Sequence, residues 1–313
     1  MLNKILDWKN WPIVAQILAI SKKIVLPGFH GMSIYAVLNF FWIGITKGLL
    51  EQRASAIAFK IILALFPTAV IIFSLIPFIP IDGFQNQILI GLQDWLPQDA
   101  YVLISETIRG LLNYKHTTFL SIGFVFGVYY ASNSIYAMLD GFSTSYHIAK
   151  GLSFWRKRLY SIVLMILMPL FMGSAFLVQT LSKLVLDFLK EQDMFFDSLE
   201  ILLFNSAKWM VIILFFALGI STLYNLGETR RKKWRIFSPG TNFSTLFIIL
   251  ISQGFAWYVN HFGQYNKLYG SLGTIVVLLM WIYLNTLILL IGFELNGSIA
   301  SAGQRKKLEA LNN

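Results

Sequence analysis

The chain has 313 residues, of which 57% are hydrophobic and only 13% are charged. Soluble domains contain roughly 25% charged residues, so this composition excludes an ordinary water-soluble globular protein. Cysteine is absent, which excludes disulfides, thiolate nucleophiles and cysteine-based metal sites. The net charge of +10 could suggest nucleic acid as a partner, but most lysines and arginines lie beside apolar segments. That position is typical of membrane anchoring, and we predict no specific nucleic acid partner.

The N-terminal residues 1–53 are predicted to be a cytoplasmic segment with interfacial helices. The first thirty residues mix lysine with proline and lack the continuous apolar core of a cleavable signal peptide. The stretch from Met32 to Leu50 is apolar, but it ends in charged residues only a few positions before the next apolar segment. Such a turn is too tight to join two spanning helices. We therefore expect this stretch to lie on the membrane surface, with spanning as the open alternative.

Six segments contain about 20 mainly apolar residues, which is the length a helix needs to cross the ~30 Å hydrocarbon layer. They are residues 54–79, 119–139, 159–181, 207–226, 243–262 and 271–300. We predict an all-α polytopic membrane helix bundle with six transmembrane helices over residues 54–302, followed by a basic tail at 303–313. Lysine and arginine in short loops stay in the cytoplasm, and six spans put most of them on the side of both termini. Both termini are therefore predicted to be cytoplasmic.

The segment from Phe84 to Asn113 follows the first span on the opposite side of the membrane. Its apolar residues recur at helical spacing on both sides of Pro97, which predicts two short amphipathic helices. We favour helices that lie on the bilayer surface over a lid that covers a cavity.

Two charged residues lie inside predicted spans, where burial of an unpaired charge costs several kcal/mol. Lys60 is about six residues into the first span and Glu294 about six residues from the end of the last, so both lie roughly 9 Å from the cytoplasmic boundary. We hypothesise that they approach one another or line one cytoplasm-facing cavity. In the alternative, Lys60 extends to the headgroups and Glu294 is a structural anchor that hydrogen-bonds between helices.

Further polar residues and prolines complete the candidate site. Asp140 closes the second span and is a candidate for the same polar layer, with Asn133 deeper in that span. An interfacial Asp140 beside the basic residues 156–158 is the favoured interpretation. The candidate hinges are prolines that remove backbone hydrogen bonds inside spans, namely Pro67, Pro77 and Pro169.

Two stretches of the sequence are distinctive. The first is the run from Arg53 to Pro67, and the second joins Tyr269-Gly-Ser-Leu-Gly, Trp281-Ile-Tyr283 and Gly292-Phe-Glu294-Leu-Asn296. Together they resemble the YihY/BrkB family of bacterial inner-membrane proteins, over most of the chain from about Leu38 to Ala302. The resemblance implies a bacterial inner-membrane location, six spans and cytoplasmic termini.

The resemblance also bears on the site and on the activity. Glu294 and Asn296 belong to a Gly-x-Glu-Leu-Asn pattern that looks like the family's own, whereas Lys60 departs from the apolar or aromatic residue usual in its helix. Members were long labelled ribonuclease BN, but metal-dependent nucleases need clustered carboxylates or histidines. The four histidines here are scattered over loops, so we expect no ribonuclease activity and no metal or other cofactor.

The family is also described as transporter-like. The resemblance therefore implies a protein that binds or moves a lipid-like or amphipathic molecule, with membrane lipids as partners. The alternative is a scaffold or regulator of the cell envelope that transports nothing. Neither the substrate nor the oligomeric state follows from the sequence.

Overall fold

The structure is a computed structural model that describes residues 22, 24–25, 33–75, 117–146, 151–191, 198–228, 234–262 and 271–311. All regular secondary structure within these residues is helical, so the prediction of an all-α membrane helix bundle is confirmed. Seven helices are described. They are α2 (Ile34–Lys47), α3 (Leu50–Leu75), α6 (Thr117–Ser143), α7 (Phe154–Glu191), α8 (Ser198–Gly227), α9 (Pro239–Phe262) and α11 (Ser271–Leu311).

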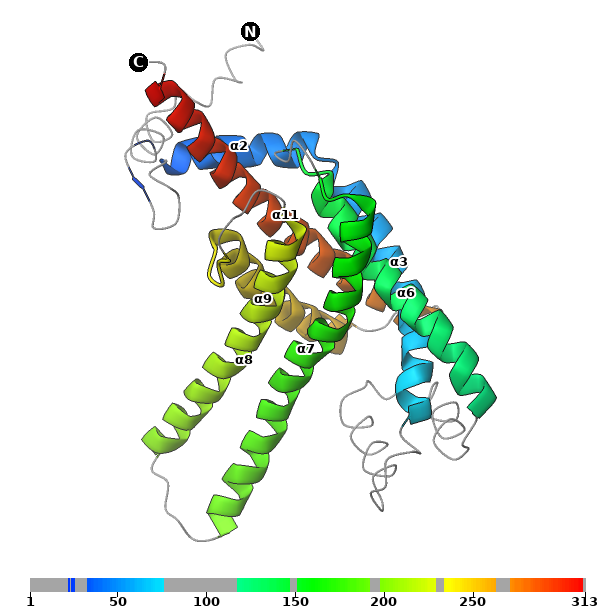
Figure 1. Cartoon of the computed structure of the whole chain (residues 1–313). Helices are drawn as coiled ribbons and strands as arrows, with labels where there is room; N and C mark the ends of the chain where they lie inside the picture. The colour runs from blue at the N-terminus through cyan, green and yellow to red at the C-terminus, as the bar shows by residue number, and fades with distance from the viewer. Residues whose placement is uncertain are drawn as a thin grey trace.

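Helix α2 lies across one end of the bundle, close to the last turns of α11 (Figure 1). It begins at the N-cap Ser33, whose side chain accepts a hydrogen bond from the amide of Ala36. With 14 residues it is roughly 21 Å long, too short to cross a ~30 Å hydrocarbon layer. Gly48 and Leu49 then turn the chain into α3, and Leu49 has a positive φ of 48°. The position of the stretch from Met32 to Leu50 on the membrane surface stays a prediction.

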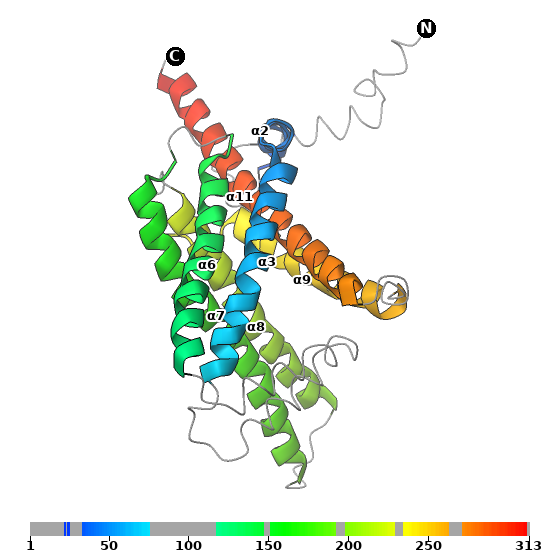
Figure 2. The same ribbon diagram turned by 90° about the vertical axis from the view of Figure 1, so that its right-hand side faces the viewer.

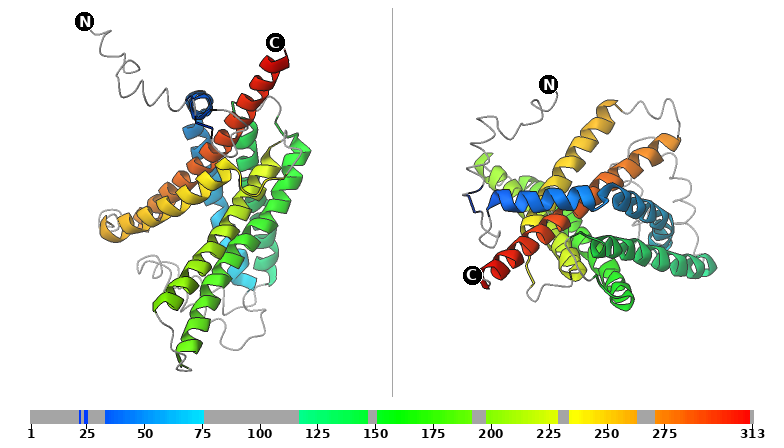
Figure 3. Two further views of the ribbon diagram at one scale, coloured as in Figure 1. Left: turned by 90° about the vertical axis from the view of Figure 1, so that its left-hand side faces the viewer. Right: turned by 90° about the horizontal axis from the view of Figure 1, so that it is seen from above.

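The other six helices form three antiparallel pairs, α3 with α6, α7 with α8, and α9 with α11. The pairs meet at the end of the bundle where α2 lies and diverge toward the other end (Figures 2 and 3). We call the shared end the basic end, because Arg53, Lys157, Arg158 and Arg235 lie there. The pair α9–α11 leans away from the pair α7–α8, so contacts between pairs concentrate near the basic end.

Four helical segments are long and apolar enough to cross a membrane. They are Phe154–Ser182, Ile201–Gly227, Pro239–Val259 and Ile275–Gln304. These four coincide with the last four expected spans. The first two expected spans coincide with α3 and α6, whose 26 and 27 residues give a length of about 40 Å. That length suffices for a crossing, and the total of six transmembrane helices stays a prediction.

Burial changes steeply along α11. Near its start Val276 is 54% exposed, whereas Leu290 is completely buried about four turns later. The largest buried cluster contains residues of α3, α6, α7, α8 and α11 and includes Phe142, Tyr224 and Phe293. The hydrophobic core therefore lies toward the basic end, and the far halves of the pairs expose apolar side chains as helices in contact with lipid do.

Several predicted features lie outside the described residues. They are the N-terminal residues before Lys22, the amphipathic segment from Phe84 to Asn113, and the candidate hinge Pro77. The other two candidate hinges are described: Pro67 lies inside α3 and Pro169 inside α7, and both helices continue past their proline. A hinge motion at these positions stays a prediction.

Candidate functional site

Glu294 is the most deeply buried charged residue of the described chain, with a relative exposure of 0%. It projects from α11 toward the turn that follows α6. One carboxylate oxygen accepts a hydrogen bond from the hydroxyl of Ser145, and the other accepts one from the backbone amide of Tyr146 at 3.2 Å. Both oxygens therefore have a donor from one short segment, which offsets part of the cost of burying a carboxylate.

Arg53 supplies a positive charge close to this carboxylate. Its guanidinium donates to the carbonyl of Gly48 at 2.8 Å and to the carbonyl of Gly141 at 2.6 Å, and it is attracted electrostatically by Glu294. Gly48 lies beside both charged groups: a Cβ atom at this position would lie 3.1 Å from a carboxylate oxygen of Glu294 and 3.4 Å from Nη1 of Arg53. The carboxylate, the Gly48 peptide and the guanidinium thus form one compact stack.

The stack brings four segments together. Glu294 comes from the middle of α11, Arg53 from the first turn of α3, Gly48 from the turn after α2, and Gly141 from the last turn of α6. The Nε of Arg53 is buried and has no hydrogen-bond partner. The guanidinium is therefore held by two backbone carbonyls and by the charge of Glu294 rather than by a direct ion pair.

The structure does not pair Lys60 with Glu294. It lies on α3 seven residues after Arg53, which is roughly 10 Å further along the helix, and it is half-buried. Among the described residues the ion pair is Lys157 with Asp140, so Lys60 and Glu294 do not reach ion-pair distance. The basic residue of α3 that acts on Glu294 is Arg53.

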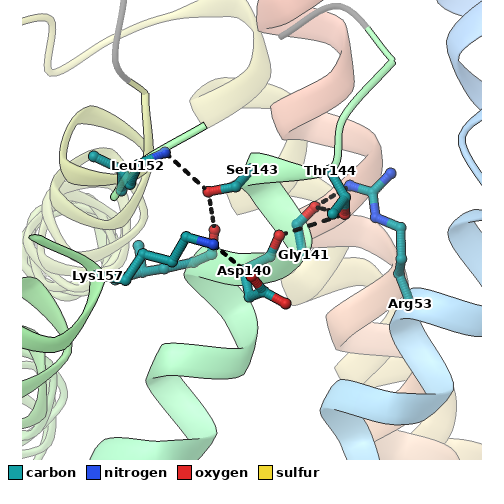
Figure 4. A network of polar contacts seen from close by, with 8 residues as sticks. Arg53, Asp140, Gly141, Ser143, Thr144, Leu152 and Lys157 are labelled. Carbon is teal, nitrogen blue, oxygen red and sulfur yellow. Dashed lines mark hydrogen bonds and ion pairs between the residues drawn. The ribbon is translucent and has the colours of Figure 1, made fainter. Parts of the chain in front are cut away.

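Asp140 lies at the surface of the last turn of α6. Its carboxylate accepts from Nζ of Lys157 at 2.5 Å, with the side chains of Asp140 and Lys157 51% and 12% exposed. Figure 4 shows this pair on the opposite side of α6 from Arg53. Asp140 is therefore an exposed partner of Lys157 in the 156–158 basic run, and its position at the membrane interface stays a prediction. Asn133 is half-buried two turns earlier in α6, and we find it in none of these contacts.

The turn from α6 to α7 is closed by local hydrogen bonds beside this pair. The hydroxyl of Ser143 donates to the carbonyl of Leu139 at 2.9 Å and accepts from the amide of Leu152 at 3.4 Å (Figure 4). Thr144 donates to the same Gly141 carbonyl that binds Arg53. These contacts fix the backbone of the segment that presents Ser145 and Tyr146 to Glu294.

Asn296 binds the start of α9. Its Oδ1 accepts from the amide of Gly240 at 2.9 Å, and its Nδ2 donates to Oγ of Ser238 at 2.9 Å. Ser238 is the N-cap of α9, with Pro239 as the first helical residue, and its hydroxyl also accepts from the amide of Thr241. Asn296 is 2% exposed, so its role is the attachment of α11 to α9.

The helices α9 and α11 touch through glycines. A Cβ on Gly240 would lie 2.0 Å from the carbonyl oxygen of Gly292, and a Cβ on Gly292 would lie 2.0 Å from the hydroxyl of Ser244. Close approach of this kind is the usual role of small residues between membrane helices. It also lets Tyr224 of α8 reach across, where its hydroxyl bonds to Ser244 at 2.6 Å and donates to the carbonyl of Leu289 at 2.7 Å.

An aromatic cluster of Phe142, Tyr224 and Phe293 joins one helix from each pair. The rings of Phe142 and Phe293 stack at 4.1 Å between centroids, and Tyr224 meets each of them edge-on at 5.6 Å. All three side chains are almost completely buried. Sequence reasoning missed this cluster, although a buried tyrosine hydroxyl in an apolar span is a signal that a polar partner must lie nearby.

The pattern Gly-x-Glu-Leu-Asn has a structural explanation. Gly292 and Asn296 are four residues apart, so they share one face of α11, and that face meets α9. Glu294 points away from that face, toward α3 and the end of α6. Phe293, which lies between Gly292 and Glu294 in the sequence, stacks on Phe142 in the aromatic cluster. One short run of α11 therefore contacts all three helix pairs.

Comparison with known proteins identifies the relatives of this arrangement. The family described as "Virulence factor BrkB" matches residues 44–312. The chain belongs to this family. YfkH of Bacillus subtilis, which bears a ribonuclease-like name, is 28% identical over 262 residues that cover 82% of this chain and 92% of YfkH. A UPF0761 membrane protein of Tolumonas auensis is 25% identical over 83% of this chain and 84% of its own length.

A third relative, a UPF0761 membrane protein of Haemophilus influenzae, is 22% identical over 85% of this chain and 95% of its own. No solved structure matches the chain. Family membership establishes an integral multi-pass membrane protein and confirms the resemblance to the YihY/BrkB family. In the described part of the chain, no three residues among His, Asp and Glu are grouped closely enough to hold a metal ion.

Proposed function

We propose that this protein resides in the bacterial inner membrane, with both termini in the cytoplasm, and that it binds and moves a lipid-like or amphipathic molecule. The observation that supports the proposal most directly is Glu294, a carboxylate with 0% exposure at the point where three diverging helix pairs meet. Intramembrane ionisable residues are costly, and they commonly mark substrate or ion pathways. The orientation rests on the positive charge of the basic end, since lysine and arginine favour the cytoplasmic side.

The divergence of the helix pairs supports an amphipathic rather than a purely polar substrate. Away from the basic end, the pairs present apolar side chains such as Leu170 and Val276, which are 59% and 54% exposed. An apolar tail can lie along such surfaces without a polar channel. Near the basic end, Glu294 and Arg53 offer charges of both signs for a polar headgroup.

A non-transporting scaffold is the competing proposal, and one observation favours it. Both carboxylate oxygens of Glu294 already accept hydrogen bonds, from Ser145 and from the amide of Tyr146. A carboxylate satisfied in this way can act purely as an anchor between α11 and the end of α6.

Lipid movement in proteoliposomes separates the two proposals. Fluorescent lipids are incorporated in both leaflets, and their accessibility to a membrane-impermeant quencher is followed for wild type, Glu294→Gln and Asp140→Asn. Glutamine retains an acceptor oxygen and the side-chain length, so Glu294→Gln is expected to fold. Asp140→Asn is the matched control. It also removes a carboxylate near the end of α6, but this carboxylate is exposed rather than buried.

A transporter predicts movement by wild type and by Asp140→Asn, and loss of movement in Glu294→Gln at unchanged thermal stability. A scaffold predicts no movement in any form and a lowered melting temperature for Glu294→Gln. If Glu294→Gln moves lipid as fast as wild type, Glu294 has no part in the mechanism. Native mass spectrometry of the same proteins identifies a lipid or small molecule that wild type retains and Glu294→Gln loses.

A further inference from the structure

The surface formed by α6 and the first turns of α7 has an excess of positive charge. Glu294 does not pair with any of these cations. Arg156, Lys157 and Arg158 are consecutive there, and the first turn of α7 contains no acidic residue. Within the described chain, Asp140 is the carboxylate that pairs with this run, and it neutralises Lys157. Two arginines therefore remain without a carboxylate partner among the described residues.

Arg158 is held along α6 rather than directed into water. Its guanidinium lies 5.8 Å from the ring centre of Tyr129, and Lys157 lies 5.9 Å from that of Tyr136. The two tyrosines are seven residues apart, so they share the face of α6 that meets α7. Tyr129 is 52% exposed, which leaves the guanidinium at the outer surface of the protein. Cation–π contacts of this kind stabilise a cation and leave its hydrogen-bond donors free for an anion.

Aromatic side chains extend this surface at the level of the basic end. The ring of Phe154 meets the rings of Tyr136 and Trp155 edge-on, with 6.0 Å and 5.4 Å between ring centroids. Phe154 and Trp155 are 59% and 79% exposed. Exposed tryptophan beside arginine and lysine is typical of the headgroup level of a membrane, where aromatic rings contact the lipid interface.

An exposed apolar track runs down α7 from Arg158. Ile162, Ile166 and Leu170 follow it at four-residue intervals and are 41%, 58% and 59% exposed. The Cα atoms of Arg158 and Leu170 are roughly 18 Å apart along the helix axis, which is close to half the ~30 Å hydrocarbon layer. The surface thus presents a cation at its top and an apolar track with the length of an acyl chain below it.

We infer that this surface binds an anionic phospholipid, with its phosphate on the guanidinium of Arg158 and an acyl chain along Ile162, Ile166 and Leu170. The planar guanidinium can donate two parallel hydrogen bonds to a phosphate. A lipid with net negative charge is favoured over a zwitterionic one, because it neutralises the arginine excess. The contacts that define this site are made by Arg158, Tyr129 and the apolar track and do not include Glu294, so the inference does not depend on the proposed transport.

The test measures binding to delipidated protein in mild detergent. Phosphatidylglycerol, phosphatidylcholine and inorganic phosphate are titrated separately, and retained lipid is counted by native mass spectrometry while the melting temperature is followed. Wild type is expected to bind phosphatidylglycerol at least about tenfold more tightly than phosphatidylcholine, because both lipids offer the same phosphate but the choline cation of phosphatidylcholine offsets its charge beside the arginines. Inorganic phosphate alone is expected to produce no comparable shift.

Arg158→Gln should abolish the preference for phosphatidylglycerol, and Arg158→Lys should retain part of it, because lysine keeps the charge but loses the planar fork. Lys208→Gln is the matched control, since Lys208 also lies over an aromatic ring, that of Trp209 at 5.9 Å, but on α8, away from the basic end. If Arg158→Gln does not fold, Tyr129→Leu tests the same site through the ring under the guanidinium. Equal loss in Arg158→Gln and Lys208→Gln would overturn the inference, as would equal affinity of wild type for the two lipids. A shift with inorganic phosphate as large as that with lipid would also overturn it.

Discussion

Replacement of Gly240 by alanine is expected to separate α9 from α11. A Cβ atom on Gly240 would lie 2.0 Å from the carbonyl oxygen of Gly292 and 2.7 Å from two atoms of the Asn296 side chain. Favourable carbon contacts lie near 3.5 Å, so α9 must shift by roughly 1 Å or more. Such a shift breaks the 2.9 Å hydrogen bond from the Gly240 amide to Asn296 and disturbs the contact of Tyr224 with Ser244.

The magnitude follows from opposing terms. Alanine gains about 1 kcal/mol over glycine in a helix. Against this, hydrogen bonds between membrane helices average about 0.6 kcal/mol and reach about 1.7, and overpacking a core costs about 1–3 kcal/mol. With two disturbed hydrogen bonds and one overpacked contact, we expect Gly240→Ala to lower the free energy of unfolding by roughly 2 kcal/mol.

Gly254 provides the control on the same helix. A Cβ atom at Gly254 has no heavy atom within 4 Å. Gly254→Ala should therefore keep the helix-propensity gain and raise the free energy of unfolding by up to about 1 kcal/mol. Both variants are unfolded in the same mixed micelles with increasing sodium dodecyl sulfate, and tryptophan fluorescence is recorded. The reasoning is refuted if Gly240→Ala is as stable as wild type, or if the two variants lose stability equally.

Two further substitutions are predicted to increase stability in the same assay. Leu49→Gly should raise the free energy of unfolding by up to about 1 kcal/mol, because a positive φ strains leucine but not glycine and the Leu49 side chain is 60% exposed. A loss of stability would show that the side chain packs more strongly than its exposure indicates. Thr245→Val removes a buried hydroxyl that has no hydrogen-bond partner and keeps the side-chain shape, so a gain of about 1 kcal/mol is expected. A loss of stability in Thr245→Val would mean that the Thr245 hydroxyl makes a hydrogen bond in the membrane-embedded protein.

The helices themselves could be predicted from local composition. Segments such as 207–226 and 243–262 coincide with α8 and α9 because membrane helices need only length and apolarity, which a sequence window measures directly. The position of Met32 to Leu50 on the membrane surface stays a prediction from the short distance to the next span, and the structure shows a tight turn at Gly48 and Leu49.

The partner of Glu294 could not be predicted in this way. The apolar run of the last span ends at Ala300, but α11 continues to Leu311, so the end of the apolar run does not mark the end of the helix. The apolar run of the first span likewise leaves Arg53 outside it, although α3 already begins at Leu50. The ends of the apolar runs therefore put Lys60 at the depth of Glu294, whereas Arg53, on the same face of α3 two turns earlier, is the residue whose charge acts on the carboxylate. Depth along one helix does not determine contacts when helices cross at an angle.

The contacts of the α11 run from Gly292 to Asn296 explain why fold and function are hard to separate in this protein. Glu294 is directly preceded by Phe293, which stacks on Phe142 of α6, and Phe142 lies only three residues before Ser145, the donor to Glu294. A change in the charge of Glu294 therefore acts on the segment that also positions the aromatic cluster. The helix pairs meet near this point, so the contacts of this run help to hold the pairs together. A substrate that binds Glu294 would then act on all three pairs through α11, whereas a scaffold would use the same contacts to hold them still.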